Sequence, residues 1–217
     1  MKIYIRLVVL TSLITSSVLL SISASASDAL SANAALVSQY FFRGIPQTTN
    51  ASASAGVDYD NGNFSAGIWV ADVQDGLEID FYGSFSHETS SGVTIHTGYT
   101  TYQYSGDFDS AYNEINLSLD YGIFSLSYNV GKHEEDLNLA IDEANYDFTS
   151  LTMESNGFYV TLGLWGKDVD GRYAEFGYNT EVVGIDLGIA LISNSKDLDI
   201  DTGTGDESLV LSIKKTF

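Results

Sequence analysis

The sequence has 217 residues, no cysteine, and 29 acidic against 9 basic residues, which gives a formal net charge of −20. Such an acidic chain is repelled by a phosphate backbone, so the composition excludes nucleic-acid binding. The lack of cysteine excludes a disulfide framework, a thiolate metal site and a thiol nucleophile.

The first 26 residues have the pattern of a secretory signal peptide. Lys2 and Arg6 form a positive start, residues 7–22 form an apolar stretch, and a small A-x-A motif ends at Ala26. This order is typical of an export signal that is removed after translocation. We expect cleavage after Ala26, which leaves residues 27–217 as one domain.

The mature chain alternates between apolar and polar residues with a period of two. Ile115, Leu117 and Leu119, for example, alternate with Asn116 and Ser118. Period two is typical of a strand with one apolar face. We predict twelve strands, of which 146–154 has the poorest alternation: 34–42, 52–60, 63–72, 78–87, 93–104, 112–121, 123–131, 146–154, 158–166, 172–180, 185–193 and 207–217.

The gaps between these strands alternate in length. The odd-numbered gaps total 53 residues over six connections, and the even-numbered gaps total 15 over five. Asn61-Gly62 and Asn156-Gly157 are hairpin-turn pairs in the short set. Short turns at one end, longer loops at the other and an even strand number are typical of an outer-membrane barrel.

A soluble β-sandwich or lipocalin-like barrel would also alternate. Against it, the strands run near ten residues, the length of a tilted membrane strand, and the chain has few Lys or Arg residues to cover a wet exterior. Aromatic residues near strand ends fit the girdles of a membrane barrel: Tyr40, Phe42, Tyr59, Phe64, Tyr121, Phe124 and Phe158. We therefore predict an all-β fold, an antiparallel transmembrane β-barrel.

The last strand ends in an aromatic residue, Phe217, on the same face as Leu209, Leu211 and Ile213. A terminal aromatic on an alternating strand is similar to the signal read by the outer-membrane assembly machinery. Lys215 departs from that pattern, and we expect it at the membrane interface, where its stem can snorkel. We expect both termini in the periplasm, long loops outside the cell, and contacts with outer-membrane lipids and lipopolysaccharide.

Several segments resemble the Gcw_chp family, also called TorF-type porins. The resemblance covers the mature chain and is carried by residues 31–48, 67–69, 77–83 and 212–217. Gln39 and Pro46 depart from the family pattern, where Asp and Ser are expected. The resemblance implies a barrel in the bacterial outer membrane of Gram-negative cells and a porin function.

The inward faces, as the alternation assigns them, carry acidic side chains and two bases. The predicted channel-lining residues are Arg43, Asp58, Asp80, Glu114, Glu175 and Asp186, with Asp120 and the base Lys214 on the same face. A lumen of that sign attracts cations. In the alternative interpretation, these acids pair with Arg43, Lys214 or hydroxyl groups in a hydrated lumen and do not determine which ions pass. Four aromatic residues also face inward: Trp69, Tyr82, Tyr159 and Trp165. They would either line a path for a sugar or nucleoside or simply fill the lumen, and filling is the favoured interpretation.

Arg43 stands out in a chain with few arginines. At the top of the first strand, its fork would bind two lumen carboxylates and fix the first loop. A structural clamp is the favoured interpretation over a constriction charge. The segment 197–203 superficially resembles a calcium loop but lacks its central Asp-Gly, so a solvated loop is the favoured interpretation. Weak binding of divalent cations, shared with lipopolysaccharide, is the alternative.

No catalytic or metal-binding constellation is evident. His133 lies beside acidic residues without an identifiable partner, and His87 and His96 have no serine motif nearby. We expect no enzyme activity and no cofactor. The sequence thus predicts a channel for passive diffusion of small solutes with cation preference. The alternative is a non-conducting structural or surface-interaction barrel with a filled lumen.

Overall fold

The computed structural model describes residues 29–198 and 205–217. The expected signal peptide, residues 1–26, lies outside this range, as do residues 199–203 of the calcium-loop-like segment 197–203. In the part of the chain that the structure describes, no helix has the length and apolar character needed to cross a membrane.

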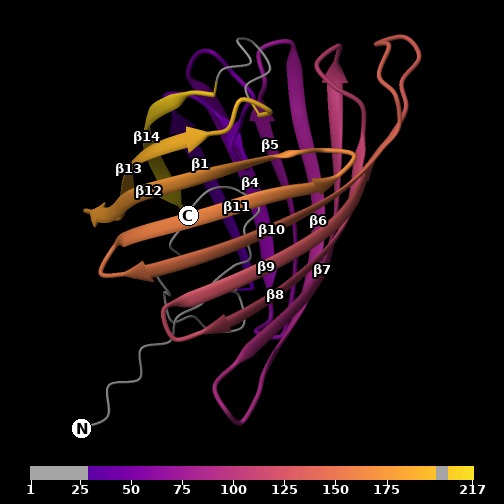
Figure 1. Cartoon of the computed structure of the whole chain (residues 1–217). Helices are drawn as coiled ribbons and strands as arrows, with labels where there is room; N and C mark the ends of the chain where they lie inside the picture. The colour runs from indigo at the N-terminus through magenta and orange to yellow at the C-terminus, as the bar shows by residue number, and fades with distance from the viewer. Residues whose placement is uncertain (1–28, 199–204) are drawn as a thin grey trace, which may run out of the picture.

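Twelve antiparallel strands form a closed barrel, because the first strand, β1, pairs with both β4 and the last strand, β14 (Figure 1). The wall strands are β1 (Leu30–Val37), β4 (Ser52–Asp60), β5 (Phe64–Asp72), β6 (Gly76–Glu88), β7 (Thr94–Gly106), β8 (Tyr112–Tyr121), β9 (Phe124–His133), β10 (Ala144–Ser155), β11 (Phe158–Lys167), β12 (Gly171–Val182), β13 (Ile185–Asn194) and β14 (Glu207–Thr216). A short hairpin of β2 (Phe41–Phe42) and β3 (Ile45–Pro46) is not part of the wall. The predicted fold class and strand number are confirmed.

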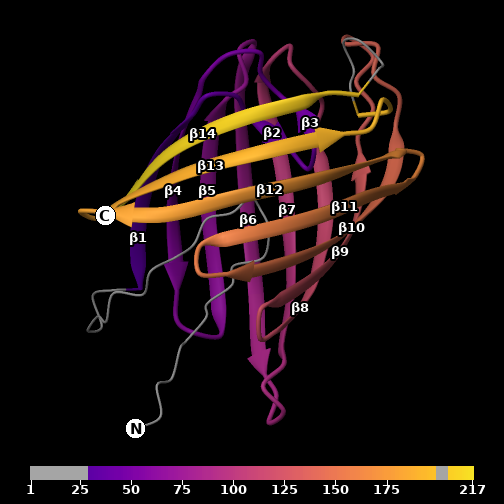
Figure 2. The same ribbon diagram turned by 60° about the vertical axis from the view of Figure 1, so that its left-hand side comes forward.

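The connections separate into two sets at opposite ends of the barrel. The loop end holds the connections that join β1 to β4, β5 to β6, β7 to β8, β9 to β10, β11 to β12 and β13 to β14. Three of these are long, at residues 38–51, 134–143 and 195–206, whereas β5–β6 and β11–β12 are joined by three residues each. Tight connections and the described termini define the turn end, where the β6–β7 hairpin extends furthest (Figure 2). The weakly alternating segment 146–154 is a full wall strand, β10.

The first strand differs from its predicted span of 34–42. It begins at Leu30 and ends at Val37, after which residues 38–51 turn into the lumen. Tyr40 is 5% exposed and Phe42 is half-buried among lumen side chains, so their assignment to an aromatic girdle was wrong. The other five predicted girdle residues project outward and are 41–62% exposed, all near the turn end.

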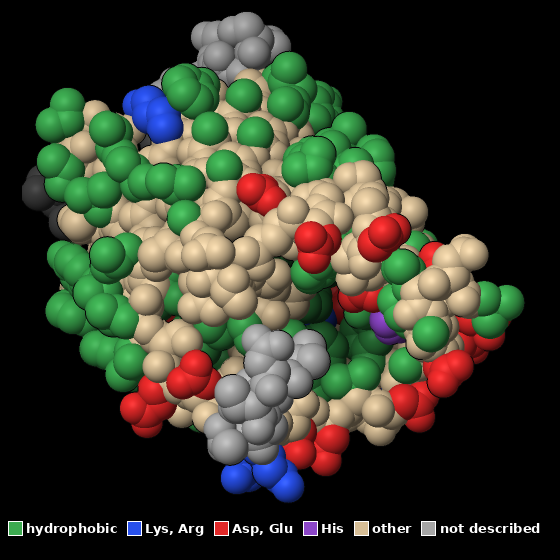
Figure 3. Space-filling view, turned by 90° about the horizontal axis from the view of Figure 1, so that it is seen from above, with side chains coloured by type: hydrophobic (Ala, Val, Ile, Leu, Met, Phe, Trp, Pro, Cys, Tyr) green, Lys and Arg blue, Asp and Glu red, His purple; other side chains and the backbone are tan. Residues whose placement is uncertain are grey.

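The two faces of the wall differ as a bilayer requires. Large apolar residues such as Ile115, Leu162 and Leu211 are 53–57% exposed on the outer face, and apolar side chains cover much of the upper and left edges of the view in Figure 3. A closed ladder leaves no strand edge unpaired, which is the condition for strands in lipid. A soluble barrel would reverse this arrangement, so the exterior defines a transmembrane barrel.

The end of the chain completes the wall. The Phe217 N–H donates to the Ala32 carbonyl at 2.8 Å, and the Phe217 side chain is 74% exposed. Lys215 lies on the outer face at the turn end, where its Nζ donates to the Gly184 carbonyl at 2.6 Å. This contact satisfies the ammonium at the rim of the barrel.

Candidate functional site

The inward segment 38–51, here called the inward hairpin, fills part of the lumen at the loop end. Its strands pair Phe41 with Pro46 and Phe42 with Ile45. The two residues of its tip, Arg43 and Gly44, have φ angles of 51° and 83°. Positive φ at both central residues is the geometry of a tight type I′ hairpin turn.

The base of the inward hairpin is held by its own polar groups. The Tyr40 N–H donates to Thr48 Oγ1 at 2.9 Å, and Gln39 Nε2 donates to the Thr48 carbonyl at 2.8 Å. The Gln47 N–H donates to the Tyr40 carbonyl at 2.8 Å. Backbone groups that leave the wall are thus paired within the hairpin, as burial requires.

The tip is fixed to three distant wall strands. Arg43 makes a bidentate ion pair with Glu114 of β8, with Nη1 and Nη2 at 2.6 and 2.8 Å from the two carboxylate oxygens. Trp165 of β11 donates to the Arg43 carbonyl at 3.1 Å, and Asn194 of β13 donates to the Gly44 carbonyl at 2.9 Å. Arg43 therefore fixes the first loop as predicted. Its guanidinium group binds one carboxylate and not two, because both terminal nitrogens donate to Glu114.

Aromatic rings surround the guanidinium. Its carbon lies 4.5 Å from the centroid of Phe148, 4.8 Å from Phe42 and 5.8 Å from Trp165. Burial alone would lower the pKa of Arg43, but the Glu114 carboxylate opposes this, and the net direction is upward. Arg43 therefore remains charged, and its charge is neutralised by Glu114.

An aromatic cluster at the loop end was not predicted. Phe41, Tyr146, Phe148, Trp165 and Tyr173 are each no more than 8% exposed and pack together beneath the loops. Tyr146 and Phe148 face the lumen from β10, while Leu151 and Met153 face outward. Because both faces of this strand carry large apolar groups, its alternation is weak in the sequence.

The predicted lining acids all face the lumen, in different environments. Asp58 accepts hydrogen bonds from Asn33 at 3.0 Å and from the Tyr82 hydroxyl. Glu175 accepts one from the Tyr159 hydroxyl at 2.5 Å. Asp80, 2% exposed, has one buried oxygen without a partner in the described structure.

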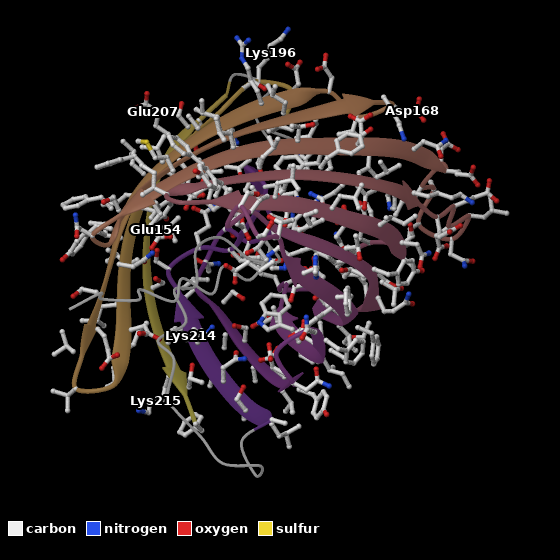
Figure 4. All side chains as sticks on the ribbon, turned by 90° about the horizontal axis from the view of Figure 1, so that it is seen from below. Glu154, Asp168, Lys196, Glu207, Lys214 and Lys215 are labelled. Carbon is white, nitrogen blue, oxygen red and sulfur yellow. The ribbon has the colours of Figure 1, made fainter. Side chains whose placement is uncertain are left out.

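Two further acids lie near the turn end of the lumen. Asp120 pairs with His96 Nε2 at 2.8 Å. Asp186 lies opposite Lys214 in the β13–β14 register, without an ion pair between them in the described residues. Viewed from the turn end, Lys214 faces the lumen while Lys215 lies on the outer side (Figure 4).

Glu78 is a lumen acid that sequence reasoning missed. It is 1% exposed, accepts a hydrogen bond from the Tyr40 hydroxyl at 3.2 Å, and its Oε2 has no partner among the described residues. It lies two residues from Asp80 on the same face of β6. The predicted strand began at residue 78, so its alternation already placed Glu78 inward.

His133 has a partner, contrary to expectation. Its Nε2 lies 2.8 Å from Asp109, and its ring stacks on Tyr112 at 4.0 Å between centroids. The Tyr112 hydroxyl also donates to Asp109 at 2.7 Å. The described residues contain no group of three acidic or histidine side chains placed to hold a metal ion.

A cavity of about 300 Å³ lies between the inward hairpin and the turn end. Tyr40 and Phe41 of the hairpin cover its inner end, and Lys214, Asp186 and Glu181 lie near its turn end. Figure 3 shows the opposite, loop end, where acidic side chains border a hollow. The hairpin residues Tyr40 and Phe41 thus border this cavity on its loop-end side.

A closed twelve-stranded wall with an apolar exterior and a polar lumen defines the class, a transmembrane β-barrel of the outer-membrane type. The chain belongs to the Gcw_chp family, described as a bacterial protein of unknown function, whose model matches residues 22–217. A search of curated proteins finds no match.

Solved structures are similar to this chain at low sequence identity, and the first below shares its fold. A structure from a study of in-meso crystallization of membrane proteins has a TM-score of 0.55 and 13% identity, covering 86% of this chain and 83% of that one. Pseudomonas aeruginosa OccK1 has a TM-score of 0.45 and 12% identity over 88% of this chain. The chain covers 66% of OccK1, just under two thirds of its length. P. aeruginosa OccK2, solved with glucuronate, has a TM-score of 0.43 and 14% identity, covering 89% of this chain and 68% of that one.

Proposed function

We propose that this chain is an outer-membrane channel through which small solutes diffuse passively, with a preference for cations. The observation that carries the proposal is the charge balance of the lumen. Arg43 is neutralised by Glu114, so Lys214 is the remaining lysine or arginine charge inside the described barrel, while Asp58, Asp80 and Glu175 face the same space. An uncompensated negative wall of low dielectric attracts cations and repels anions.

In this proposal the inward hairpin sets the narrowest point of the path. It crosses from the β1–β4 side to β8, β11 and β13, and its contacts hold it at one depth. Twelve strands enclose more space than the filled eight-stranded barrels and less than open sixteen-stranded porins. A folded loop in such a barrel narrows the lumen to the size of small solutes.

The orientation is part of the proposal. Long loops lie outside the cell and both termini lie in the periplasm, as in other barrels with short periplasmic turns. Phe217 provides the signal for the assembly machinery. The acidic loop residues contact lipopolysaccharide through weakly shared divalent cations.

One observation favours a second candidate, a non-conducting structural or surface-interaction barrel. The inward hairpin and the aromatic cluster of Phe41, Phe148 and Trp165 fill much of the loop-end half. If the hairpin never leaves a continuous path, Arg43 is a clamp for a plug and not part of a constriction.

Conductance separates the two candidates. The mature chain, refolded and inserted into a planar bilayer, should give discrete current steps in KCl. A variant without the anchoring pair, Arg43→Met with Glu114→Gln, should give larger or noisier steps because its hairpin is held less firmly. A silent wild-type barrel that conducts only in this variant would favour the plugged alternative.

A further inference from the structure

The turn-end cavity contains a buried carboxylate, Glu175, for which residues 29–198 and 205–217 supply no ion-pair partner. Glu175 is 2% exposed, and its Oε1 accepts the hydrogen bond from Tyr159. Among the described residues Glu175 forms no ion pair with a lysine, arginine or histidine, and its side chain lines the cavity. A buried carboxylate is costly unless a cation or further donors compensate it.

The lumen bases do not supply that cation. Arg43 uses both terminal nitrogens on Glu114, which lies on β8, several strands away from Glu175 on β12. Lys214 on β14 lies opposite Asp186, near the turn end of β13, whereas Glu175 lies opposite Ile192, near its loop end. Glu175 is therefore open to a positive group that enters the cavity.

The walls around Glu175 are apolar and aromatic. Phe41, Trp69, Ala190 and Ile192 line the cavity with it. Trp69 packs edge-on against Tyr40 at 5.7 Å between centroids. Aromatic faces attract organic cations, and apolar walls favour a ligand with a hydrocarbon body over a hydrated metal ion.

The charges nearer the turn end add to the same preference. Glu154, Glu181 and Asp186 line the cavity there against the single base Lys214. A volume of about 300 Å³ is at the lower end of the range for small-molecule sites. These features suit a compact monocation and disfavour an anion.

We infer that the turn-end cavity binds small organic ammonium ions with an apolar body, with Glu175 as the counter-ion. This inference deepens the proposed function and rests on it for the passage of the ligand through the barrel. Binding itself requires only the folded barrel. Organic ammonium ions are favoured over inorganic cations at this site because the apolar body of an organic ligand would contact Phe41 and Trp69.

Three probes that share a phenylethyl group test the inference by titration calorimetry on the mature barrel in detergent micelles. 2-Phenylethylammonium is positive, 2-phenylethanol is neutral and 3-phenylpropionate is negative. The ammonium should bind saturably, with a dissociation constant at least tenfold lower than those of the other two probes. A hydrogen bond between charged groups contributes enough free energy for a tenfold difference in affinity. Equal binding of the alcohol, tighter binding of the propionate, or no saturable binding of the ammonium would overturn the inference.

Variants locate the site. Glu175→Gln keeps the side-chain shape and should weaken ammonium binding at least tenfold, and Ala190→Phe should abolish it by filling the cavity. Lys214→Gln should tighten binding, an effect that misfolding cannot produce. Asp142→Asn, the same kind of charge change on an exposed loop-end residue, should leave binding unchanged. Unaltered binding in Glu175→Gln would overturn the assignment of the counter-ion.

The result is distinguishable from failure of the channel proposal. If the barrel binds the ammonium but gives no current in a bilayer, the inference about the binding site stands and the channel proposal fails. A barrel that conducts but binds no probe retains the channel and loses the site.

Discussion

Arg43 and Glu114 lie 71 positions apart in the sequence, yet their side chains form a bidentate ion pair inside the barrel, at 2.6 and 2.8 Å. Both are at most 5% exposed. The pair joins the tip of the inward hairpin to the opposite wall, so it fixes the depth of the hairpin. It also removes the charge of Arg43 from the electrostatic balance of the lumen.

Breaking either half of this pair should destabilise the barrel more than removing both. Arg43→Met or Glu114→Gln alone leaves a buried group unpaired, and each should lower the free energy of unfolding by about 3–5 kcal/mol. The double variant should lower the free energy of unfolding by less than either single variant, because it leaves no buried charge unpaired. Urea titration of the barrel in lipid vesicles, followed by tryptophan fluorescence, measures all four proteins. Additive losses would mean that the two side chains are not coupled.

The tip of the hairpin depends on glycine at position 44. Its φ is +83°, and a Cβ there would lie 2.6 Å from the Tyr173 side chain. Gly62 is a matched control, because its φ is +93° and a Cβ there would meet nothing within 4 Å. Gly62→Ala should cost only the left-handed backbone penalty, about 1–2 kcal/mol.

Gly44→Ala should therefore destabilise the barrel by about 1–3 kcal/mol more than Gly62→Ala, since a clash adds to the same backbone penalty. The same urea titration compares them. Equal losses in the two variants would show that the tip does not lie against Tyr173.

The orientation can be tested with single cysteines, because the chain has none. Asn138 lies exposed in the β9–β10 loop, and Ser90 lies exposed in the β6–β7 turn. Asn138→Cys should react with a membrane-impermeant maleimide on intact cells, whereas Ser90→Cys should react only after lysis. Labelling of Ser90→Cys alone on intact cells would reverse the proposed orientation.

Most of the wall was predictable from the sequence, because a bilayer and a wet lumen impose opposite polarity on alternate residues. The predicted strands 112–121 and 158–166 differ from β8 and β11 by at most one residue at an end. The prediction was wrong at residues 38–42, which end in three aromatic residues although the chain has left the wall. Aromatic residues suit a wall strand and a hairpin buried inside the lumen equally well, so they do not distinguish the two.

The candidate site was only partly predictable. Period two placed Asp80 and Glu175 on the inner face, and the rarity of arginine drew attention to Arg43. The partner of Arg43 was not predictable, because a contact across the lumen depends on how far the inward hairpin reaches. The signal in the sequence was the pair Arg43-Gly44 after two aromatic residues, a pattern compatible with a tight turn.

The most direct test of the cation-preferring channel is the reversal potential across a planar bilayer under a KCl gradient at low ionic strength. We expect a potential of the sign given by K⁺ passing more readily than Cl⁻. It should shrink towards 1 M salt, where the screening length falls to about 3 Å. The double variant Asp80→Asn, Glu175→Gln should reduce it, and Asp142→Asn should not. A reversal potential of the opposite sign, or an absence of current from correctly folded barrel, would contradict the account.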